Sequence, residues 1–589
     1  MAPPTLLCVP IAVHDAETAL ADAREARLHG ADLVEYRIDQ FFTGQVSTGP
    51  ESAAKGGASW EEREILRMVA ESPLPCIVTC RPAEGEEGGY YEGPEEARIA
   101  LLERLATAFG PGEKPPRYID VELCAYLRSP AVRQRLNLAL HHPERLGDLR
   151  TSLILSVHDF LGRPRDLTRK VLRMQEAAEA AVCKVAYRCR SVRDNLELLD
   201  LPREMGRPTI ALGIGEYGLM SRVRAPKFGG FLTFAALRAG GETAPGQPTI
   251  RELLCTYHFR SIRESTAVYG LIGWPVAHSL SPLVHNAGFH TTGIDAVYVP
   301  LPVPPGYEHF KATVLSLIDH RGLDFRGCSV TTPHKENLLR LAEELRRVPG
   351  AGAVGTPPHE WEIDASAAAC GAANTLVIER EEGTNAPVRA VVMNTDGAAA
   401  AACLAASLGD LAAKRVAIVG AGGAARAIAS ALLMADATVV VYNRTRERAE
   451  GMVEDLRRRM PQRQFGLGRI GAGAMTDLAR SCCDAYVNCT PVGMASGPDP
   501  EGAAIPVTEL ADCGAETVVM DTVYNPVVTP LLRLADAAGL RTIDGLAMFI
   551  RQAAGQFEAW TGKGAPLGLF ELIAREAVAQ VPGASVVVE

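Results

Sequence analysis

Short apolar runs alternate with stretches of helical periodicity from residue 1 to about residue 240. Apolar residues recur at helical spacing in segments such as Ala16–His29 and Leu167–Ala180. The runs expected to form strands are Leu6–Val13, Ala31–Asp39, Cys76–Arg81, Tyr118–Leu123, Leu153–Phe160, Ala181–Tyr187, Pro208–Ile214 and Phe231–Leu237. Eight strands with helices between them predict a (β/α)8 barrel, with a doubly wound parallel sheet as the alternative.

Two further series of strands and helices follow, and they predict an α/β architecture for the rest of the chain. Turn-forming residues at Gly240–Pro248 indicate the end of the first series. New series start at Val268–Gly273 and at Arg415–Gly420, and the last runs to about residue 540. Prolines and glycines interrupt Pro349–Ala373, so we expect this segment to be a loop insertion.

The chain has 589 residues, of which 47% are hydrophobic and 22% charged, as in a folded globular protein. The formal net charge is -10 and no Lys/Arg-rich block stands out, so nucleic acid is not an expected partner. The longest apolar runs, Gly397–Gly409 and Ala427–Ala435, are shorter than the roughly 20 residues that a membrane span needs, so no membrane partner is expected. Acidic residues come early with no cationic region before them, so we expect no targeting peptide.

Fourteen cysteines are scattered along the chain, and none forms a C-x-x-C pair. Several lie in apolar runs, which favours small buried thiols in a reducing compartment, and we therefore expect a cytoplasmic protein. The sequence contains no H-E-x-x-H motif, so no metal cofactor is expected.

Ionisable residues gather where the expected barrel strands end. Glu35, Arg37 and Asp39 alternate along one run, so their side chains share one face of a strand. His158 follows an apolar run, and Lys184 lies inside one, where a charged residue is costly to bury. In a barrel, polar groups at the carboxyl ends of the strands bind the substrate.

Lys184 and His158 allow two interpretations. The first is structural, with Lys184 at a strand edge and His158 hydrogen-bonded in the core. The second is catalytic, and the charged residues around the pair favour it; these are Glu35, Arg37, Arg81 and Arg222. A lysine that is desolvated and surrounded by cations has a lowered pKa and can form a Schiff base with a ketone. The histidine would then move protons, and the arginines would hold a carboxylate.

These residues stand in motifs that resemble the type I 3-dehydroquinate dehydratase family across residues 1–250. The motifs are Glu35–Asp39, Glu87–Gly89, Ser156–Asp159, Lys184–Ala186, Ser221–Arg222 and Ala244–Gln247. The resemblance implies that Lys184 forms the imine and that His158 is the general acid and base. The substrate contacts that it implies are Glu35, Arg37, Arg81, Arg222, Gln247 and Thr243, the last in place of the family's usual serine.

A glycine-rich turn lies between an apolar strand and a helical pattern in the last series. Its residues are Gly420, Ala421, Gly422, Gly423, Ala424 and Ala425. This is the G-x-G-x-x-A pattern of dinucleotide-binding folds, in which glycines let a pyrophosphate approach the helix N-terminus. A plain tight turn between strand and helix is the alternative.

Four polar motifs follow apolar runs in the second series. They are Gly273–Asn286, Ser329–Glu336, Ala373–Thr375 and Asn394–Gly397. Any one of them could be a capped helix start, and we expect Ser281 to be an N-cap with Pro282 after it. All four together suit a polyhydroxylated ligand.

With Asp521–Pro526 and Gly545–Gln552, these motifs resemble shikimate dehydrogenase across residues 265–589. The resemblance implies Lys335 and Asp396 as the catalytic pair, since ketone reduction needs a proton donor and a lysine held by a carboxylate can supply the proton. Their long spacing departs from the family's usual length. The shikimate contacts that the resemblance implies are Ser279, Ser281, Thr331, Asn374, Tyr524 and Gln552, and the cofactor contacts include Gly545.

The residues after the expected strand Thr438–Tyr442 indicate which dinucleotide binds. An NAD enzyme has Asp or Glu about 20 residues beyond the glycines, but the corresponding residue here is Asn443. Arginines that follow it can bind a 2′-phosphate, which favours NADP(H). The expected contacts, in an Asn-Arg-Thr-x-x-Arg pattern met in the family, are Asn443, Arg444, Thr445 and Arg448. The alternative is that Asn443 or Thr445 caps a helix and the arginines are solvated.

The two resemblances predict a bifunctional enzyme whose partners are small molecules: 3-dehydroquinate, 3-dehydroshikimate and shikimate. A barrel over 1–250 would dehydrate the first compound to the second. A substrate-binding lobe over 265–397, completed by 541–589, and a Rossmann NADP lobe over 398–540 would reduce the second compound to the third.

Two rival functions stay open on the sequence. The second half could act on quinate, a close polyhydroxylated relative of shikimate. The whole chain could be an inactive sensor, because quinate-responsive repressors resemble the same domains. Intact Lys184, His158, Lys335 and Asp396 argue against the sensor.

Overall fold

The fold is that of a computed structural model, which divides the chain into two compact units, Met1–Thr266 and Ala267–Glu589. The structure describes residues 4–42, 59–83, 88–110, 113–141, 150–277, 279–346, 358, 360–460, 469–507, 510, 514 and 516–579. The motif residue Glu87 and residues 349–357 of the expected insertion lie outside these ranges. Within them, no helix is both long and apolar enough to cross a membrane.

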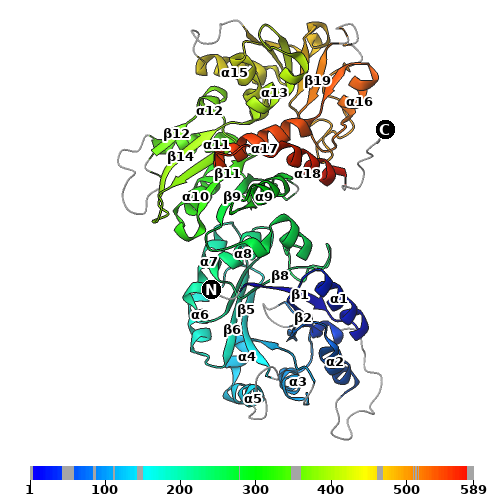
Figure 1. The fold of residues 1–589 in the computed structure, drawn as a ribbon, viewed down its shortest axis with the longest axis vertical. Coiled ribbons are helices and arrows are strands. Elements are labelled where there is room, and N and C mark those ends of the chain that lie inside the picture. The colour runs from blue at the N-terminus through cyan, green and yellow to red at the C-terminus, as the bar shows by residue number, and fades with distance from the viewer. Residues whose placement is uncertain are drawn as a thin grey trace. The chain divides into compact units, whose positions relative to one another are not determined.

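The first unit is a nearly closed barrel of eight parallel strands, which confirms the predicted fold (Figure 1). The strands are β1 (Leu6–Ala12), β2 (Leu33–Arg37), β3 (Cys76–Thr79), β4 (Tyr118–Glu122), β5 (Ser152–Asp159), β6 (Ala180–Arg188), β7 (Thr209–Ile214) and β8 (Leu232–Phe234). Each strand pairs with the next in chain order, except that β8 pairs with β1. At the remaining seam, the Phe231 N–H donates to the Thr209 carbonyl oxygen at 2.8 Å.

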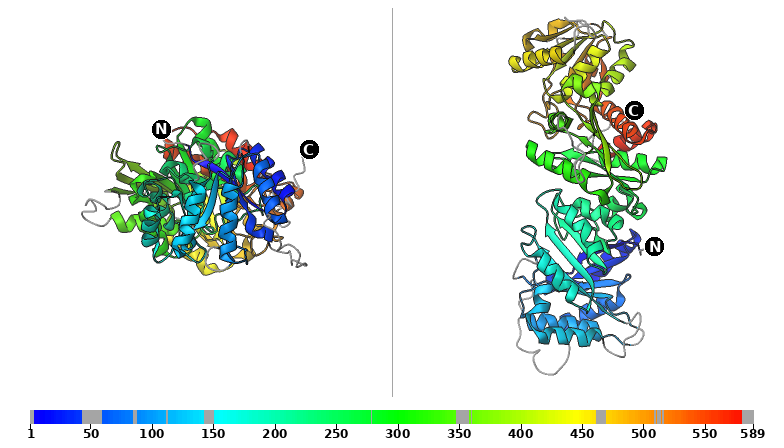
Figure 2. Two further views of the ribbon diagram at one scale, coloured as in Figure 1. Left: turned by 90° about the horizontal axis from the view of Figure 1, so that it is seen from below. Right: turned by 90° about the vertical axis from the view of Figure 1, so that its left-hand side faces the viewer.

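Helices cover the outside of the barrel (Figures 1 and 2). They are α1 (Ala16–Leu28), α2 (Trp60–Glu71), α3 (Glu95–Thr107), α4 (Leu123–Arg128), α5 (Pro130–Leu140), α6 (Leu167–Glu176), α7 (Asp194–Glu204) and α8 (Leu219–Arg224). In α1, Asp15 is the N-cap, accepting a hydrogen bond from the Thr18 N–H, and Ala19, Leu20 and Ala23 are buried. A polar cap and an apolar stripe therefore fix this helix against the strands.

The interior of the barrel follows the two-residue alternation of its strands. Apolar side chains such as Ile154, Val182 and Ala186 belong to one buried cluster inside it. Since side chains alternate between the two faces of a strand, Lys184 shares the inner face with Val182 and Ala186. The same alternation turns His158 inward on β5, because it lies four residues after Ile154.

The segment Gly240–Pro248 comes after the last barrel strand, β8, and contacts the loop that follows β7. The Pro245 carbonyl accepts a hydrogen bond from Gly215, just beyond β7, at 2.8 Å. A side chain at Gly246 would clash with the Gly215 oxygen at 2.2 Å, so the two backbones are in close contact. The chain then continues in the first unit as far as Thr266.

The second unit contains two six-stranded sheets, as expected for an α/β dehydrogenase fold (Figures 1 and 2). The first sheet is built from β9 (Ala267–Gly273), β10 (Ala296–Pro302), β11 (Phe325–Val330), β12 (Glu360–Ile363), β13 (Thr375–Arg380) and β14 (Pro387–Met393). Its order is β10-β9-β11-β13-β14-β12, and β13 runs antiparallel to both neighbours.

The second sheet is entirely parallel and has the strand order of a Rossmann fold, which confirms that prediction. Its strands are β15 (Arg415–Val419), β16 (Thr438–Tyr442), β17 (Ile470–Gly473), β18 (Ala485–Asn488), β19 (Val518–Asp521) and β20 (Arg541–Ile543). In space they are ordered β17-β16-β15-β18-β19-β20. The order reverses beside β15, and ligands of open parallel sheets bind at such a switch point.

The helices of this unit are α9 (Ser281–Thr292), α10 (Tyr307–Asp319), α11 (Lys335–Arg346), α12 (Ala365–Cys370), α13 (Asp396–Leu408), α14 (Gly423–Met434), α15 (Arg446–Arg459), α16 (Pro530–Ala537), α17 (Gly545–Thr561) and α18 (Leu567–Ala579). Helices α17 and α18 return to the first sheet, where Phe557 and Phe570 pack with Phe289 of α9. The expectation of a loop over Pro349–Ala373 is wrong for its described part, which contains β12 and α12. The Asp364 carboxylate accepts the Ser366 N–H at the start of α12.

His285 is buried in the aromatic cluster of α9, and its ring centroid lies 4.7 Å from that of Tyr298. Burial lowers the pKa of His285 to about 3, although Gln556 acts in the opposite direction. Below about pH 6.5 this histidine is protonated in the unfolded chain but stays neutral in the folded chain. The free energy of unfolding therefore falls as the pH is lowered through about 6.5.

We expect His285→Phe to reduce the acid sensitivity of the second unit. Between pH 7.5 and 5.5 the parent should lose about 1.4 kcal/mol more of its unfolding free energy than the variant, as measured by urea titration. Phe289→Leu disturbs the same cluster without removing a titratable group and should keep the parent's pH dependence. An identical pH dependence in parent and His285→Phe would contradict the assignment.

Candidate active sites

One cavity at the carboxyl ends of the barrel strands is lined by all eight residues expected to act there. They are Glu35, Arg37, Arg81, His158, Lys184, Arg222, Thr243 and Gln247. Thr243 and Gln247 come from the returning segment and bond to each other, with the Thr243 N–H donating to Gln247 Oε1 at 3.1 Å. The structure thus brings together residues from six places in the chain at the end where barrels bind substrates.

The groups that contact the Lys184 ammonium are carboxylates. Its Nζ donates to Asp120 Oδ2 at 3.0 Å and to Glu35 Oε1 at 3.2 Å, and it lies 4.5 Å from the centre of the Phe234 ring. The expectation that cations surround this lysine is therefore wrong. The expected arginines line the same cavity, but Arg37 forms a bidentate ion pair with Asp39 and Arg81 pairs with Asp120.

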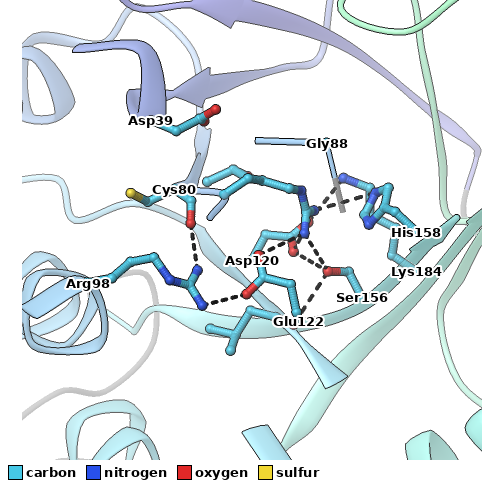
Figure 3. Close-up of polar contacts among 12 residues, drawn as sticks. Asp39, Cys80, Gly88, Arg98, Asp120, Glu122, Ser156, His158 and Lys184 are labelled. Atoms are coloured by element: carbon cyan, nitrogen blue, oxygen red, sulfur yellow. Dashed lines mark hydrogen bonds and ion pairs between the residues drawn. The ribbon is translucent and has the colours of Figure 1, made fainter. Parts of the chain in front are cut away.

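A chain of buried ion pairs runs from Lys184 to the outer helix α3 (Figure 3). Arg81 Nη2 lies 2.9 Å from Asp120 Oδ1, and Arg81 Nη1 donates to Glu122 Oε1 at 3.0 Å. Arg98 of α3 donates to the other Glu122 oxygen at 2.7 Å. Arg98 is itself fully buried and also donates to the Cys80 carbonyl.

Two groups in the cavity have pKa values that burial changes. Burial, then the Arg81 and Lys184 cations, hold the pKa of His158 well below its ordinary value, so its imidazole is neutral near pH 7. A neutral imidazole can accept a proton. Burial also lowers the pKa of Arg222 to about 10. Arg222 donates to the Gly213 carbonyl at 3.1 Å.

Sequence reasoning missed Asp120, Glu122 and Ser156. Their two-residue spacing could have predicted Asp120 and Glu122, because they alternate along β4 as Glu35 and Arg37 do along β2. Ser156 similarly precedes His158 by two residues on β5. Conversely, Asp39 is not on a strand, since β2 ends at Arg37 and a short 3₁₀ helix begins at Ile38.

In the second unit, Lys335 and Asp396 are in direct contact although they come from different helices. Lys335 Nζ donates to Asp396 Oδ2 at 2.5 Å, and the Asn374 side chain donates to Asp396 Oδ1 at 2.9 Å. Asp396 and Asn374 are buried, whereas the Lys335 side chain is 19% exposed. One carboxylate is therefore held at both oxygens, with the partly exposed Lys335 side chain on one side.

A second polar network joins Gln552 to this pair. Gln552 Nε2 donates to Gln556 Oε1 at 2.9 Å, one turn further along α17. Gln556 Nε2 in turn donates to the Asn374 carbonyl at 3.2 Å. Ser329 donates to Gln556 and accepts from Tyr298, both at 2.8 Å. Sequence reasoning missed Gln556, although its four-residue spacing from Gln552 places both on one helix face.

Ser279 and Ser281 are adjacent, with their Oγ atoms 3.2 Å apart. The prediction that Ser281 is the N-cap of α9 is wrong, because Ser281 is the first helical residue and its N–H donates to Ser279 Oγ. Thr331 follows β11 and packs against Gly273. Tyr524 follows β19, and its ring centroid lies 5.3 Å from that of Phe549 on α17.

The glycine-rich turn lies beside Lys335. A Cβ built on Gly423 would be 3.8 Å from Lys335 Cδ, so the start of α14 faces this lysine. Helix α13, which begins with Asp396, packs closely on α14, since a side chain at Gly397 would meet the Ala427 oxygen at 2.4 Å. The close helix packing thus fixes Asp396 relative to the turn. Gly545 opens α17 and packs against the Val523 carbonyl.

The residues after β16 do not cap α15 through their side chains. Thr445 is the N-cap residue but makes no side-chain cap, and Asn443 Nδ2 donates to the Thr445 carbonyl at 2.8 Å. Arg446 pairs with Glu450 at 2.8 Å. Among the described residues, Arg444 and Arg448 form no ion pair, and no group of three or more His, Cys, Asp or Glu could hold a metal.

Four protein families match this chain. Type I 3-dehydroquinase matches residues 7–264, and the shikimate dehydrogenase substrate binding domain matches 271–356. Shikimate / quinate 5-dehydrogenase matches 403–465, and the shikimate 5′-dehydrogenase C-terminal domain matches 545–571.

Among curated proteins, the chain is similar to the bifunctional 3-dehydroquinate dehydratase/shikimate dehydrogenase, chloroplastic, of Arabidopsis thaliana. The two are 33% identical over 588 residues, which cover 96% of this chain and 84% of that protein. The chain belongs to this bifunctional family. It combines a type I 3-dehydroquinate dehydratase, a lyase, with an NADP-dependent shikimate dehydrogenase, an oxidoreductase, and it acts in the shikimate pathway.

The dehydrogenase half also has single-function relatives. Shikimate dehydrogenase (NADP(+)) of Methanocella arvoryzae is 36% identical over 313 residues, covering 53% of this chain and 99% of that protein. A crystal structure of shikimate 5-dehydrogenase from Thermus thermophilus in complex with NADP(H) and shikimate has a TM-score of 0.42 at 29% identity, covering 53% of this chain and 100% of that one.

The glycine-rich turn of the dehydrogenase unit fits the pyrophosphate of NADP(H). Gly420 has a φ of 117°, and a Cβ there would meet the Cys489 oxygen at 2.9 Å, so the fold itself requires this glycine. Gly422 differs, because a Cβ there would meet nothing within 4 Å. The space in front of Gly422 is open at the N-terminus of α14, where a phosphate is favoured.

We expect Gly420→Ala and Gly422→Ala to have different effects. Gly420→Ala should cost about 1–3 kcal/mol of unfolding free energy, because it strains the backbone. Gly422→Ala should change stability by less than about 0.5 kcal/mol, yet raise the KM for NADPH roughly tenfold, since its methyl group enters the open space. Urea unfolding and steady-state kinetics measure both. An unchanged KM in Gly422→Ala would contradict this placement of the cofactor.

Proposed function

We propose that Lys184 and His158 are the catalytic residues of the dehydratase unit. The observation that carries this assignment is the position of Lys184 Nζ, buried in the cavity beside a neutral His158. Arg222, whose positive charge is buried at the cavity wall, is suited to hold the substrate carboxylate. The other expected contacts are Glu35, Arg37, Arg81, Thr243 and Gln247.

The dehydration proceeds by covalent catalysis in this proposal. The Lys184 ammonium lends a proton to the neutral His158, the amine so formed attacks the ketone of 3-dehydroquinate, and His158 returns that proton as the hydroxyl leaves as water, so a protonated imine forms. His158 takes a proton from the adjacent carbon, the electron pair forms an enamine, and the histidine returns the proton to the departing hydroxyl. Water then hydrolyses the imine, which releases 3-dehydroshikimate and restores the lysine. The net change is the loss of one water.

We infer that Lys335 is the proton donor of the dehydrogenase unit and that Asp396 holds it. NADPH, when bound, supplies the hydride. Lys335 Nζ donates its proton to the ketone oxygen of 3-dehydroshikimate, and its exposed side lets water replace that proton. The proposed shikimate contacts are Ser279, Ser281, Thr331, Asn374, Tyr524 and Gln552.

We also propose the division of the dehydrogenase unit into two lobes. The first sheet with its returning helices forms a substrate lobe over 265–397 and 541–589, and the parallel sheet forms the NADP lobe over 398–540. The packing of α17 and α18 with α9 supports the assignment of the last residues to the substrate lobe. The cofactor contacts would be Gly420, Ala421, Gly422, Gly423, Ala424, Asn443, Arg444, Thr445, Arg448 and Gly545.

For localisation, we propose the cytoplasm. No disulfide joins the thirteen cysteines in the described part of the chain, which suits a reducing compartment. Three of these thiols, on Cys124, Cys255 and Cys482, are exposed rather than buried as the sequence suggested.

Borohydride should trap the proposed imine on Lys184. With 3-dehydroquinate present, mass spectrometry should find ligand mass on Lys184 and on no other lysine. Lys184→Ala should abolish dehydration but keep the reduction of 3-dehydroshikimate. Lys335→Ala is the reciprocal control, and it should lose roughly 10²–10⁴-fold in reduction while dehydration stays within twofold. Dehydration that survives in Lys184→Ala would overturn the assignment.

Arg444→Ala should weaken binding of the cofactor's 2′-phosphate. Since hydrogen bonds to a charged group contribute about 1.5–3 kcal/mol, we expect the KM for NADPH to rise roughly 10–100-fold with little change in kcat. The KM for NADH should stay the same. Arg446→Ala, which removes a neighbouring arginine already paired with Glu450, is the matched control. An equal kcat/KM for NADH and NADPH in the parent would refute the proposed role of Arg444.

A further inference from the structure

We propose that Asp120 is a further catalytic residue of the dehydratase unit, the counter-ion that keeps the Lys184 imine nitrogen protonated. The inference rests on the proposed role of Lys184. Asp120 was not among the residues expected from the sequence, and it does not line the cavity. Its carboxylate lies beneath the lysine, with Oδ2 at 3.0 Å from Nζ.

Both carboxylate oxygens of Asp120 have polar partners. Oδ2 faces the lysine, while Oδ1 accepts from Ser156 Oγ at 2.5 Å and lies 2.9 Å from Arg81 Nη2. The side chain is fully buried. Burial alone would raise the pKa of Asp120, but Arg81 and then Lys184 outweigh it and hold that pKa below its ordinary value. The carboxylate is therefore charged throughout the working pH range.

Arg81, which lines the cavity, is held on its other side by a second carboxylate, and this keeps it paired with Asp120. Glu122 accepts from Arg81 Nη1, and Arg98 bonds the second Glu122 oxygen (Figure 3). Arg98 is in turn bound by both oxygens of Glu95, each at 2.8 Å. This series of ion pairs holds the Asp120 carboxylate in one orientation.

Charge balance explains why the imine needs this carboxylate. A lysine ammonium and a ketone give a protonated imine and one water, so the positive charge stays on the same nitrogen. An anion 3.0 Å away stabilises that charge before and after the reaction. When the enamine forms, the nitrogen becomes neutral and His158 gains the proton. Asp120 also favours protonation of His158, so the same carboxylate balances either cation.

Glu35 is less suited to this task. It is the second carboxylate at Lys184, at 3.2 Å, but it lines the cavity and its Oε1 also accepts from Thr79 at 2.7 Å. A group exposed to the cavity is available to the substrate. Asp120 does not line the cavity, and its Oδ2 stays on the lysine nitrogen.

The test compares the pH dependence of dehydration in the full chain of the parent and of Asp120→Asn. Removing an anion in contact with a protonated nitrogen lowers the pKa of that nitrogen by about one unit or more. We expect the alkaline limb of kcat to move to lower pH by at least about one unit, with kcat reduced at least tenfold and KM within about threefold. Glu197→Gln removes the same charge from an ion pair with Arg163 that lies outside this series, and it should leave the limb in place.

Further variants and borohydride trapping make the test of Asp120 conclusive. If circular dichroism shows that Asp120→Asn does not fold, Asp120→Ser replaces it. Asp120→Glu keeps the negative charge, so the alkaline limb of its kcat profile should stay where the parent has it. A folded neutral variant whose limb moves by less than about 0.3 units would overturn the proposal. Borohydride trapping in the parent separates the two failures. If Lys184 is trapped and the limb does not move, only the role of Asp120 is wrong; if Lys184 is not trapped, the proposed imine itself is wrong.

Discussion

Pairing of buried charges is the constraint on which the first unit depends. Isolated ions inside a protein cost several kcal/mol each, so they are stable there only with partners of opposite charge. From Lys184 through Asp120, Arg81 and Glu122 to Arg98, cations and anions alternate from the barrel cavity to the outer helix α3. The pairing fixes the side chains before a substrate arrives, and a site that is already oriented does not have to reorganise during the reaction. The ion pairs thus offset the cost of burying these charges, and they also hold the charged side chains around the cavity in one orientation.

The second unit positions the Lys335–Asp396 ion pair through close packing of two helices. Asp396 starts α13, which meets α14 at Gly397 without room for a side chain. The pair therefore lies where the two sheets approach each other, beside the glycine-rich turn. Neutral amides complete the site, since Asn374 bonds Asp396 and Gln556 bonds the Asn374 backbone. A site built between two sheets in this way depends on how closely their helices pack.

Much of the fold could be predicted because apolar runs bounded by turn residues mark strands reliably. All eight expected barrel runs overlap an observed strand, and β3 begins at Cys76 as expected. What could not be predicted is the partner of each charge. The pattern places Lys184 on an inner face, but it does not show that carboxylates from β2 and β4 meet the ammonium, because such contacts depend on register between strands. The expected loop over Pro349–Ala373 was wrong for the same reason, and the contacts that Gly240–Pro248 makes with the loop after β7 could not be predicted either. These segments are ordered by contacts with distant residues, which no local pattern records.

The two lysines show how burial matches each side chain to its chemistry. The Lys184 side chain is 6% exposed and contacts two carboxylates, whereas the Lys335 side chain is 19% exposed and contacts one. A nucleophile that forms a covalent bond to the substrate must be kept from water, which would hydrolyse the imine too early, and its charge must be balanced inside the protein. A proton donor has the opposite need, because it must recover a proton from solvent after every turnover. The deeper lysine therefore suits the covalent catalysis proposed for Lys184, and the more accessible one suits the proton transfer proposed for Lys335. Burial and partners are what distinguish the two side chains.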